Sequence, residues 1–123
     1  MKYQKILITD DSGTSRMIIK RCIEMAGFFD IDYLEAEDGL QGLTILDKEK
    51  VDLIITDLKM PKMDGKTFIR KLKSNDNTKD IPVVVISSLD NAVLKERLER
   101  EGVLAVISKP LSPAKVLDFM EEE

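Results

Sequence analysis

At 123 residues the chain is long enough for one compact domain and too short for two of ordinary size, so we predict a single domain over residues 1–123. Its 43% of hydrophobic residues exclude a disordered chain, its net charge of −4 gives no support for contact with nucleic acid, and no stretch approaches the roughly 20 apolar residues of a membrane span. The absence of histidine excludes histidine-based acid–base catalysis and the commonest zinc and haem ligand sets.

The N-terminus leads directly into the first apolar run, residues 5–9, with no signal-peptide pattern, which predicts a cytoplasmic protein. A segment of helical periodicity follows and ends before Gly27, a residue typical of helix ends. Cys22 lies in this segment and is the single cysteine, so no internal disulfide can form. We predict that it is a small buried hydrophobe on the helix.

Four further apolar runs alternate with four further helical segments. The runs are residues 31–36, 52–56, 83–87 and 104–108. All except 31–36 are nearly continuous in apolar residues, which is typical of strands covered on both faces, whereas 31–36 alternates as an edge strand does. The predicted helices cover residues 38–48 with leucines at positions 40, 43 and 46, residues 66–73, a segment from an N-cap at Asp90 to Gly102, and a segment opened by Ser112 and Pro113.

Five alternations of strand and helix predict an α/β fold with a parallel sheet between two layers of helices. A crossover helix returns the chain so that the next strand runs in the same direction. In such sheets, ligands bind beyond the carboxyl ends of the strands. Functional residues are therefore expected immediately after the apolar runs.

Polar residues stand at those positions after four of the five runs. They are Asp10, Asp11, Asp57, Ser87, Ser88 and Lys109. A helix cap could explain any one acid or serine taken alone, but not three acids and a lysine together. We therefore expect these side chains to share one edge of the sheet.

This combination has a definite chemistry. Three carboxylates at close range favour a hard cation with oxygen ligands, and Mg²⁺ is commonly held by one or two carboxylates together with phosphate oxygens. A lysine and a hydroxyl on the same edge suit phosphoryl oxygens. The residues thus indicate phosphoryl transfer to an aspartate.

Over its whole length, the chain resembles the receiver domains of response regulators, and in size the CheY-like regulators of chemotaxis. The resemblance rests on Asp10-Asp11, on Asp57 within TDLKMPKMDG (56–65), on Ser87 and on Lys109-Pro110, each at the expected strand end. It implies a flavodoxin-like (βα)5 fold, doubly wound, with five parallel strands in the order 2-1-3-4-5.

The resemblance also implies roles for single residues. Asp57 would be the phospho-acceptor, and Mg²⁺ would be bound by Asp11, Asp57 and the backbone carbonyl of Lys59, with Asp10 acting largely through water. Ser87 would donate a hydrogen bond to a phosphoryl oxygen.

Lys109 would pair with the phosphoryl group, and the Lys109-Pro110 bond would be cis. In the loop after Asp57, Gly65 would supply a backbone conformation that other residues resist.

Partners follow from the same resemblance. A histidine kinase or a histidine phosphotransfer protein would donate the phosphoryl group, and a chain without histidine cannot itself be that donor. A downstream target protein, for example one in chemotaxis, would bind the surface formed by the fourth helix, fifth strand and fifth helix. The chain itself would not contact nucleic acid or membrane directly. The chain would be a switch with slow self-hydrolysis and not a turnover enzyme.

Three positions depart from the family pattern. Val106 stands where many members carry an aromatic residue that rotates on activation, so we hypothesise that activation repacks the fourth helix and the loop after Ser87 without an aromatic gate. Lys59 and Leu89 stand where fast-hydrolysing members carry polar groups that position water, which predicts slower loss of the phosphoryl group.

Three other interpretations remain. A haloacid-dehalogenase-type phosphatase needs a second acid two residues after the nucleophile, where this chain has Lys59. An FMN-binding module would use residues 12–15 as a phosphate cradle, but Asp10 and Asp11 would repel the phosphate. A pseudo-receiver that acts only as a scaffold would not need the intact acidic set.

Overall fold

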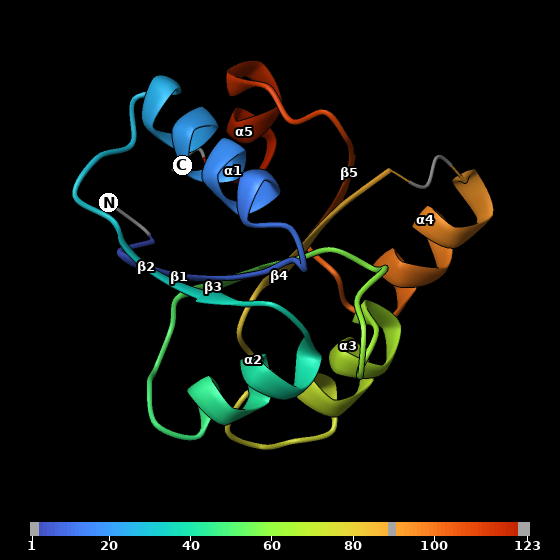
Figure 1. Ribbon diagram of the computed structural model, residues 1–123. Helices are drawn as coiled ribbons and strands as arrows, with labels where there is room; N and C mark the ends of the chain where they lie inside the picture. The colour runs from blue at the N-terminus through green and yellow to red at the C-terminus, as the bar shows by residue number, and fades with distance from the viewer. Residues whose placement is uncertain (1–2, 89–90, 121–123) are drawn as a thin grey trace.

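A five-stranded parallel sheet forms the centre of the molecule, as the computed structural model of residues 3–88 and 91–120 shows (Figure 1). The strands are β1 (Lys5–Thr9), β2 (Asp32–Ala36), β3 (Leu53–Thr56), β4 (Val83–Ser87) and β5 (Ala105–Ser108). The helices are α1 (Gly13–Met25), α2 (Gly39–Leu46), α3 (Gly65–Lys73), α4 (Ala92–Arg100) and α5 (Pro113–Met120). The strand order β2-β1-β3-β4-β5 confirms the predicted flavodoxin-like topology.

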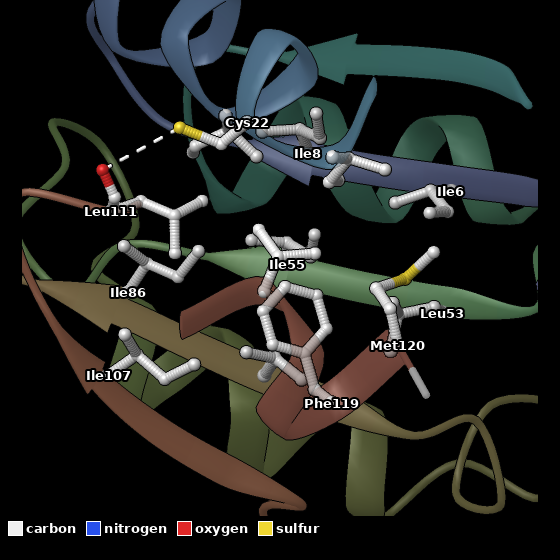
Figure 2. Packing of buried hydrophobic residues seen from close by; sticks show 14 of the residues in the cluster. Ile6, Ile8, Cys22, Leu53, Ile55, Ile86, Ile107, Leu111, Phe119 and Met120 are labelled. Carbon is white, nitrogen blue, oxygen red and sulfur yellow. Dashed lines mark hydrogen bonds between the residues drawn. The ribbon is translucent and has the colours of Figure 1, made fainter. Parts of the chain in front are cut away.

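Two layers of helices cover the sheet. Helices α1 and α5 lie on one face, and α2, α3 and α4 lie on the other (Figure 1). Because strand side chains alternate, Ile6 and Ile8 of β1 pack under α1 and α5, whereas Leu7 packs on the opposite face. Figure 2 shows the first of these clusters, in which α5 places Phe119 and Met120 against the strands.

Cys22 belongs to the same cluster. Its side chain is buried in α1, and its Sγ lies 3.6 Å from the backbone oxygen of Leu111 (Figure 2). The prediction of a buried hydrophobic cysteine is confirmed. Burial also raises the pKa of the Cys22 thiol, which favours its protonated form.

The edges of the sheet agree only in part with the sequence pattern. Residues 31–36 contain the edge strand β2, as predicted, but residues 104–108 contain the other edge strand, β5, and are not covered on both faces. Leu104 is 50% exposed, and Ala105 and Val106 are partly exposed. A nearly continuous apolar run therefore does not show that a strand is central, because the edge strand β5 has such a run and is only partly covered.

The helix limits differ from the predicted ones by a few residues. Helix α2 is shorter than 38–48, and Leu40 is 46% exposed, because Gly42 and not Leu40 lies against the sheet, next to Phe68 and Thr9. Asn91 caps α4 by accepting hydrogen bonds from two backbone N–H groups, and the predicted cap, Asp90, lies outside the described residues. Within the described residues, no helix has the length and apolar character needed to cross a membrane.

Candidate functional site

Backbone hydrogen bonds fix three strand ends at one edge of the sheet. The N–H of Asp10 donates to Ala36 (3.0 Å), the N–H of Asp57 donates to Thr9 (2.9 Å), and the N–H of Lys109 donates to Ser87 (2.8 Å). Each bond continues a parallel ladder by one residue beyond its strand. The side chains of Asp10, Asp57 and Lys109 are thus brought together from positions far apart in the sequence.

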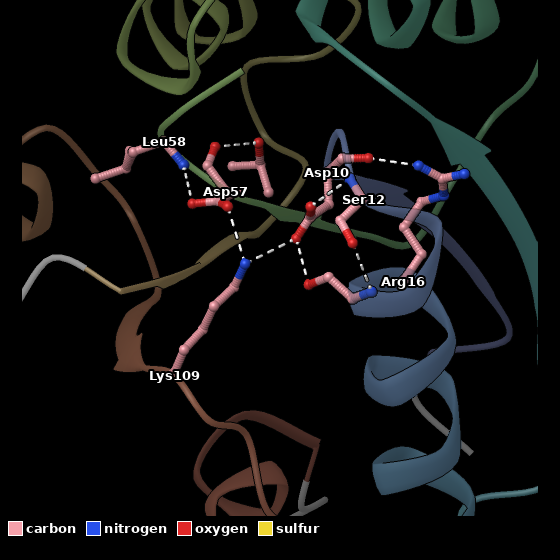
Figure 3. A network of polar contacts seen from close by, with 8 residues as sticks. Asp10, Ser12, Arg16, Asp57, Leu58 and Lys109 are labelled. Atoms are coloured by element: carbon pink, nitrogen blue, oxygen red, sulfur yellow. Dashed lines mark hydrogen bonds and ion pairs between the residues drawn. The ribbon is translucent and has the colours of Figure 1, made fainter.

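Lys109 joins two of the acids. Its Nζ lies 2.9 Å from Oδ2 of Asp57 and 3.0 Å from Oδ2 of Asp10 (Figure 3). Burial alone would lower the pKa of Lys109, but the hydrogen bonds and charges of Asp57 and Asp10 outweigh it and raise the pKa above its ordinary value. The bridge is therefore a charged ammonium between two carboxylates.

The carboxylate of Asp10 is buried and accepts further hydrogen bonds. Oδ1 accepts from the N–H of Ser12 (2.9 Å), and Oδ2 accepts from the hydroxyl of Ser15 (2.6 Å). The guanidinium of Arg16 donates to the backbone oxygen of Asp10 (Figure 3) and also binds Glu35. Ser12 is the N-cap of α1, and the sequence did not predict these contacts of residues 12–16 with Asp10.

Asp11 completes an acidic cluster. One carboxylate oxygen from each of Asp10, Asp11 and Asp57 lies within 4.8 Å of the others. Asp11 is exposed, and none of the hydrogen bonds above involves its side chain. With the carboxyl groups ionised and Lys109 protonated, two negative charges remain, which suits a divalent cation with oxygen ligands.

The loop after β3 is packed tightly against Asp57. The N–H of Leu58 donates to Oδ1 of Asp57 (2.7 Å), and the hydroxyl of Thr56 donates to the backbone oxygen of Asp57 (2.8 Å). A Cβ on Gly65 would collide with that same backbone oxygen. The prediction that Gly65 supplies an unusual conformation is wrong, because the positive φ of the loop (64°) falls at Lys62, and Gly65 is needed for close approach.

Ser87 and Lys59 lie beside two cavities. Ser87 is buried and, with Leu58 and Val106, lines a cavity of about 180 Å³ next to α4. Lys59 lines an open cavity of about 580 Å³ together with Asp11. Leu89, the other position predicted to affect hydrolysis, lies outside the described residues.

The segment between β5 and α5 holds the backbone around Lys109. The Lys109-Pro110 bond is cis, as predicted, and Leu111 is buried under α1. The Nζ of Lys115 donates to the backbone oxygens of Ser108 (3.0 Å) and Pro110 (3.1 Å), one on each side of Lys109.

Fold, acidic cluster and bridging lysine together define a class of protein. The response regulator receiver domain family matches the chain over residues 6–121, so the chain belongs to this family and is a receiver domain of two-component signalling. This membership argues against the phosphatase and FMN interpretations.

Within the family, the chain is CheY-like. It is 34% identical to a probable chemotaxis protein CheY of Rhizobium etli over 95% of this chain and 89% of that protein. It is 37% identical to the sensor histidine kinase CheAY of Helicobacter pylori over 87% of this chain and 13% of that protein. Among solved structures, the chemotaxis response regulator CheY4 of Vibrio cholerae superposes with a TM-score of 0.79, at 26% identity over 93% of this chain and 92% of that one.

Proposed function

We propose that Asp57 accepts a phosphoryl group from a phosphohistidine of a histidine kinase or histidine phosphotransfer protein. The observation that carries the proposal is the Lys109 ammonium held between Asp10 and Asp57 at the edge where the acids cluster. In the transfer, the N–P bond of the donor breaks and its electron pair stays on the imidazole. A P–O bond forms to a carboxylate oxygen of Asp57, which gives an acyl phosphate.

The residues around Asp57 support this chemistry. The N–H of Leu58 and the ammonium of Lys109 orient its carboxylate, and Lys109 carries a positive charge next to the point where phosphoryl oxygens would gather. Ser87, at the end of β4, would donate a hydrogen bond to one of these oxygens. Such fixed donors lower the barrier because they do not have to reorganise during the transfer.

We also propose that the acidic cluster holds Mg²⁺, since three carboxylate oxygens within 4.8 Å of one another fit a hard divalent cation. Asp11, Asp57 and the backbone carbonyl of Lys59 would hold the ion directly, and Asp10 would act through water. When bound, the ion would neutralise the carboxylates and the incoming phosphoryl oxygens.

A labelling experiment tests both parts. The purified chain is incubated with acetyl phosphate or phosphoramidate, with Mg²⁺ or with EDTA, and its mass is measured intact. We expect a gain of one phosphoryl group that requires Mg²⁺ and is lost in Asp57→Asn. The matched control is Asp52→Asn, which changes the aspartate at the opposite end of β3 and should leave labelling intact.

Labelling that persists in Asp57→Asn would place the acceptor elsewhere. No labelling of the unaltered chain would support the pseudo-receiver alternative, in which the domain is a scaffold.

The chain would act as a switch and not as a turnover enzyme. Water would attack the acyl phosphate slowly, release phosphate and regenerate the Asp57 carboxylate. Leu89 has no polar group that could position this water, and Lys59 would either shield the phosphoryl group or point to solvent, so Leu89→Glu combined with Lys59→Asn should speed phosphoryl loss. An unchanged rate would contradict this explanation.

The output surface is proposed to be α4, β5 and α5. Three large apolar side chains are exposed on or beside these elements, with exposures of 66% for Val93, 50% for Leu104 and 39% for Leu117. The cavity between Ser87, Val106 and α4 leaves room for α4 to repack without an aromatic gate. Unchanged positions of Ser87 and α4 between free and beryllofluoride-bound protein would contradict this route.

A further inference from the structure

The carboxylate of Asp10 is crowded with hydrogen-bond donors. Oδ1 accepts from the N–H of Ser12 at 2.9 Å, and Oδ2 accepts from the hydroxyl of Ser15 at 2.6 Å and from Nζ of Lys109 at 3.0 Å. The side chain is 2% exposed, so bulk water hardly reaches it. The hydrogen bonds of this carboxylate are therefore set by donors of the protein and not by solvent.

Most of the acceptor sites of the Asp10 carboxylate are already occupied. A carboxylate oxygen has about two lone-pair directions, so two donors fill Oδ2 of Asp10 and one site remains on Oδ1. Asp57 has one donor on each oxygen, and Asp11 takes part in none of these bonds. A cation at this edge thus has free oxygen sites mainly on Asp11 and Asp57.

Ser15 fills the second site on Oδ2 because of where α1 begins. Ser12 is the N-cap, and Ser15 is the third residue of the helix, where a Glu or Gln side chain often reaches back to the N–H of the cap. Here Asp10 accepts that N–H, and the hydroxyl of Ser15 donates to Asp10. The start of α1 thus fixes the orientation of an acid that precedes it.

We propose that Ser15 is a positioning residue that limits the affinity of the acidic cluster for a divalent cation and keeps Asp10 as a water-mediated partner. The inference rests on the proposed cation site. The hydroxyl occupies a lone pair of Oδ2 that would otherwise bind the cation directly, so the two compete, while the open site on Oδ1 can still accept from a water of the cation. Removing the hydroxyl leaves a buried carboxylate with an unfilled acceptor site, which cation binding can satisfy.

The test is a binding measurement that needs no phosphoryl donor. Mn²⁺, as a paramagnetic substitute for Mg²⁺, is titrated into the whole chain, free Mn²⁺ is followed by electron paramagnetic resonance, and Mg²⁺ is then added as a competitor. In Ser15→Ala we expect both cations to bind about three- to tenfold more tightly, the range that corresponds to the net contribution of an ordinary intramolecular hydrogen bond. Ser15→Thr, which keeps a hydroxyl at this position, should return the affinity to that of the unaltered chain.

Thr14→Ala is the matched control, because Thr14 is an exposed hydroxyl residue one position earlier on α1. The affinity of this variant for both cations should equal that of the unaltered chain. Circular dichroism verifies folding, and Ser15→Cys, with its weak S–H donor, replaces Ser15→Ala if that variant is unfolded. Unchanged or weaker binding without the hydroxyl, or no recovery in Ser15→Thr, would overturn the assignment and leave the proposed function standing. No binding by the unaltered chain would overturn the cation site itself, and the assignment with it.

Discussion

Strand β3 has an aspartate at each end, and the two differ in every respect that matters for function. Asp52, just before the strand, is exposed, and its Oδ2 accepts from the N–H groups of Gln4 and Lys5, both at 2.9 Å. Asp57, just after the strand, is buried, pairs with a lysine and lies among other acids. An acidic residue at a strand end is therefore not a functional site by itself. The edge of the sheet at the C-terminal ends of the strands is where the other groups of the site lie.

The difference also separates stability from function. Asp52 accepts hydrogen bonds from two backbone N–H groups at the start of β1, which contributes to folding. Asp57 adds a negative charge to a cluster that already holds two, and proteins commonly tolerate such a cost at functional sites. Four comparisons between variants extend this contrast, beginning with the largest expected effect on stability.

Lys109→Met should cost about 3 kcal/mol of unfolding free energy, because it leaves the buried carboxylates of Asp10 and Asp57 without their shared cation. Urea unfolding measures the loss, and added Mg²⁺ should recover part of it by binding the folded state. Lys79→Met, which breaks an exposed pair with Asp76, is the control and should cost less than about 1 kcal/mol. Equal losses in the two variants would mean that the buried bridge is no stronger than a surface pair.

Gly65→Ala should cost about 2 kcal/mol, because the added methyl group collides with the backbone oxygen of Asp57 and the start of α3 must move. Gly13→Ala is the matched control. Gly13 is also the first residue of a helix after its N-cap, but a Cβ there meets only the tip of Arg16 at 3.5 Å. Thermal unfolding of both variants should separate them, and similar melting temperatures would contradict the close approach at Gly65.

Asp52→Ala should cost about 1 kcal/mol, since the N–H groups of Gln4 and Lys5 lose an acceptor but stay open to water. Asp57→Asn should cost less than this or even stabilise the fold, because it removes one charge from the cluster. Urea titrations of the two variants compare the ends of β3 directly. A larger loss in Asp57→Asn would show that this end, too, is built for stability.

Glu35→Gln should have the smallest effect, below about 1 kcal/mol, because the Glu35 pairs lie at the exposed edge of the sheet. Hydrogen bonds from Lys20 and then Arg16 hold the pKa of Glu35 below its ordinary value of 4.5. The stabilisation is therefore present above 4.5 and is lost as the pH falls through the lowered pKa. The difference between Glu35→Gln and the unaltered chain should shrink over that range, and a constant difference would argue against these ion pairs.

The sequence predicts the fold and the place of the site for one physical reason. Alternating strands and helices force parallel strands, so residues that follow the strands meet at one edge, whereas Asp52, which precedes its strand, is excluded. This rule selected Asp10, Asp11, Asp57 and Lys109, which the structure brings together. Their chemical roles remain predictions until labelling and cation binding are measured.

What the sequence could not predict depends on side-chain direction and close packing. The hydroxyl of Ser15 reaches Asp10 only because α1 starts at Gly13, and that limit is not fixed by the residue types alone. The need for glycine at position 65 lies in a contact with Asp57 and not in a turn type. Helix caps are similarly ambiguous, because Asp90 and Asn91 are neighbours with equal preference for the cap position.

The contacts of Lys115 with the segment around Lys109 bear on how a change at Asp57 would be transmitted through the fold. The Nζ of Lys115 donates to a backbone carbonyl on either side of Lys109, and Leu111 of the same segment is buried in the core. The backbone of Lys109 is therefore held by contacts on both sides. The side chain of Lys109 would therefore respond to a change at Asp57 more readily than its backbone. The Lys109 side chain would thus respond to the charge at Asp57. A conformational change would have to be transmitted through the end of β4 instead.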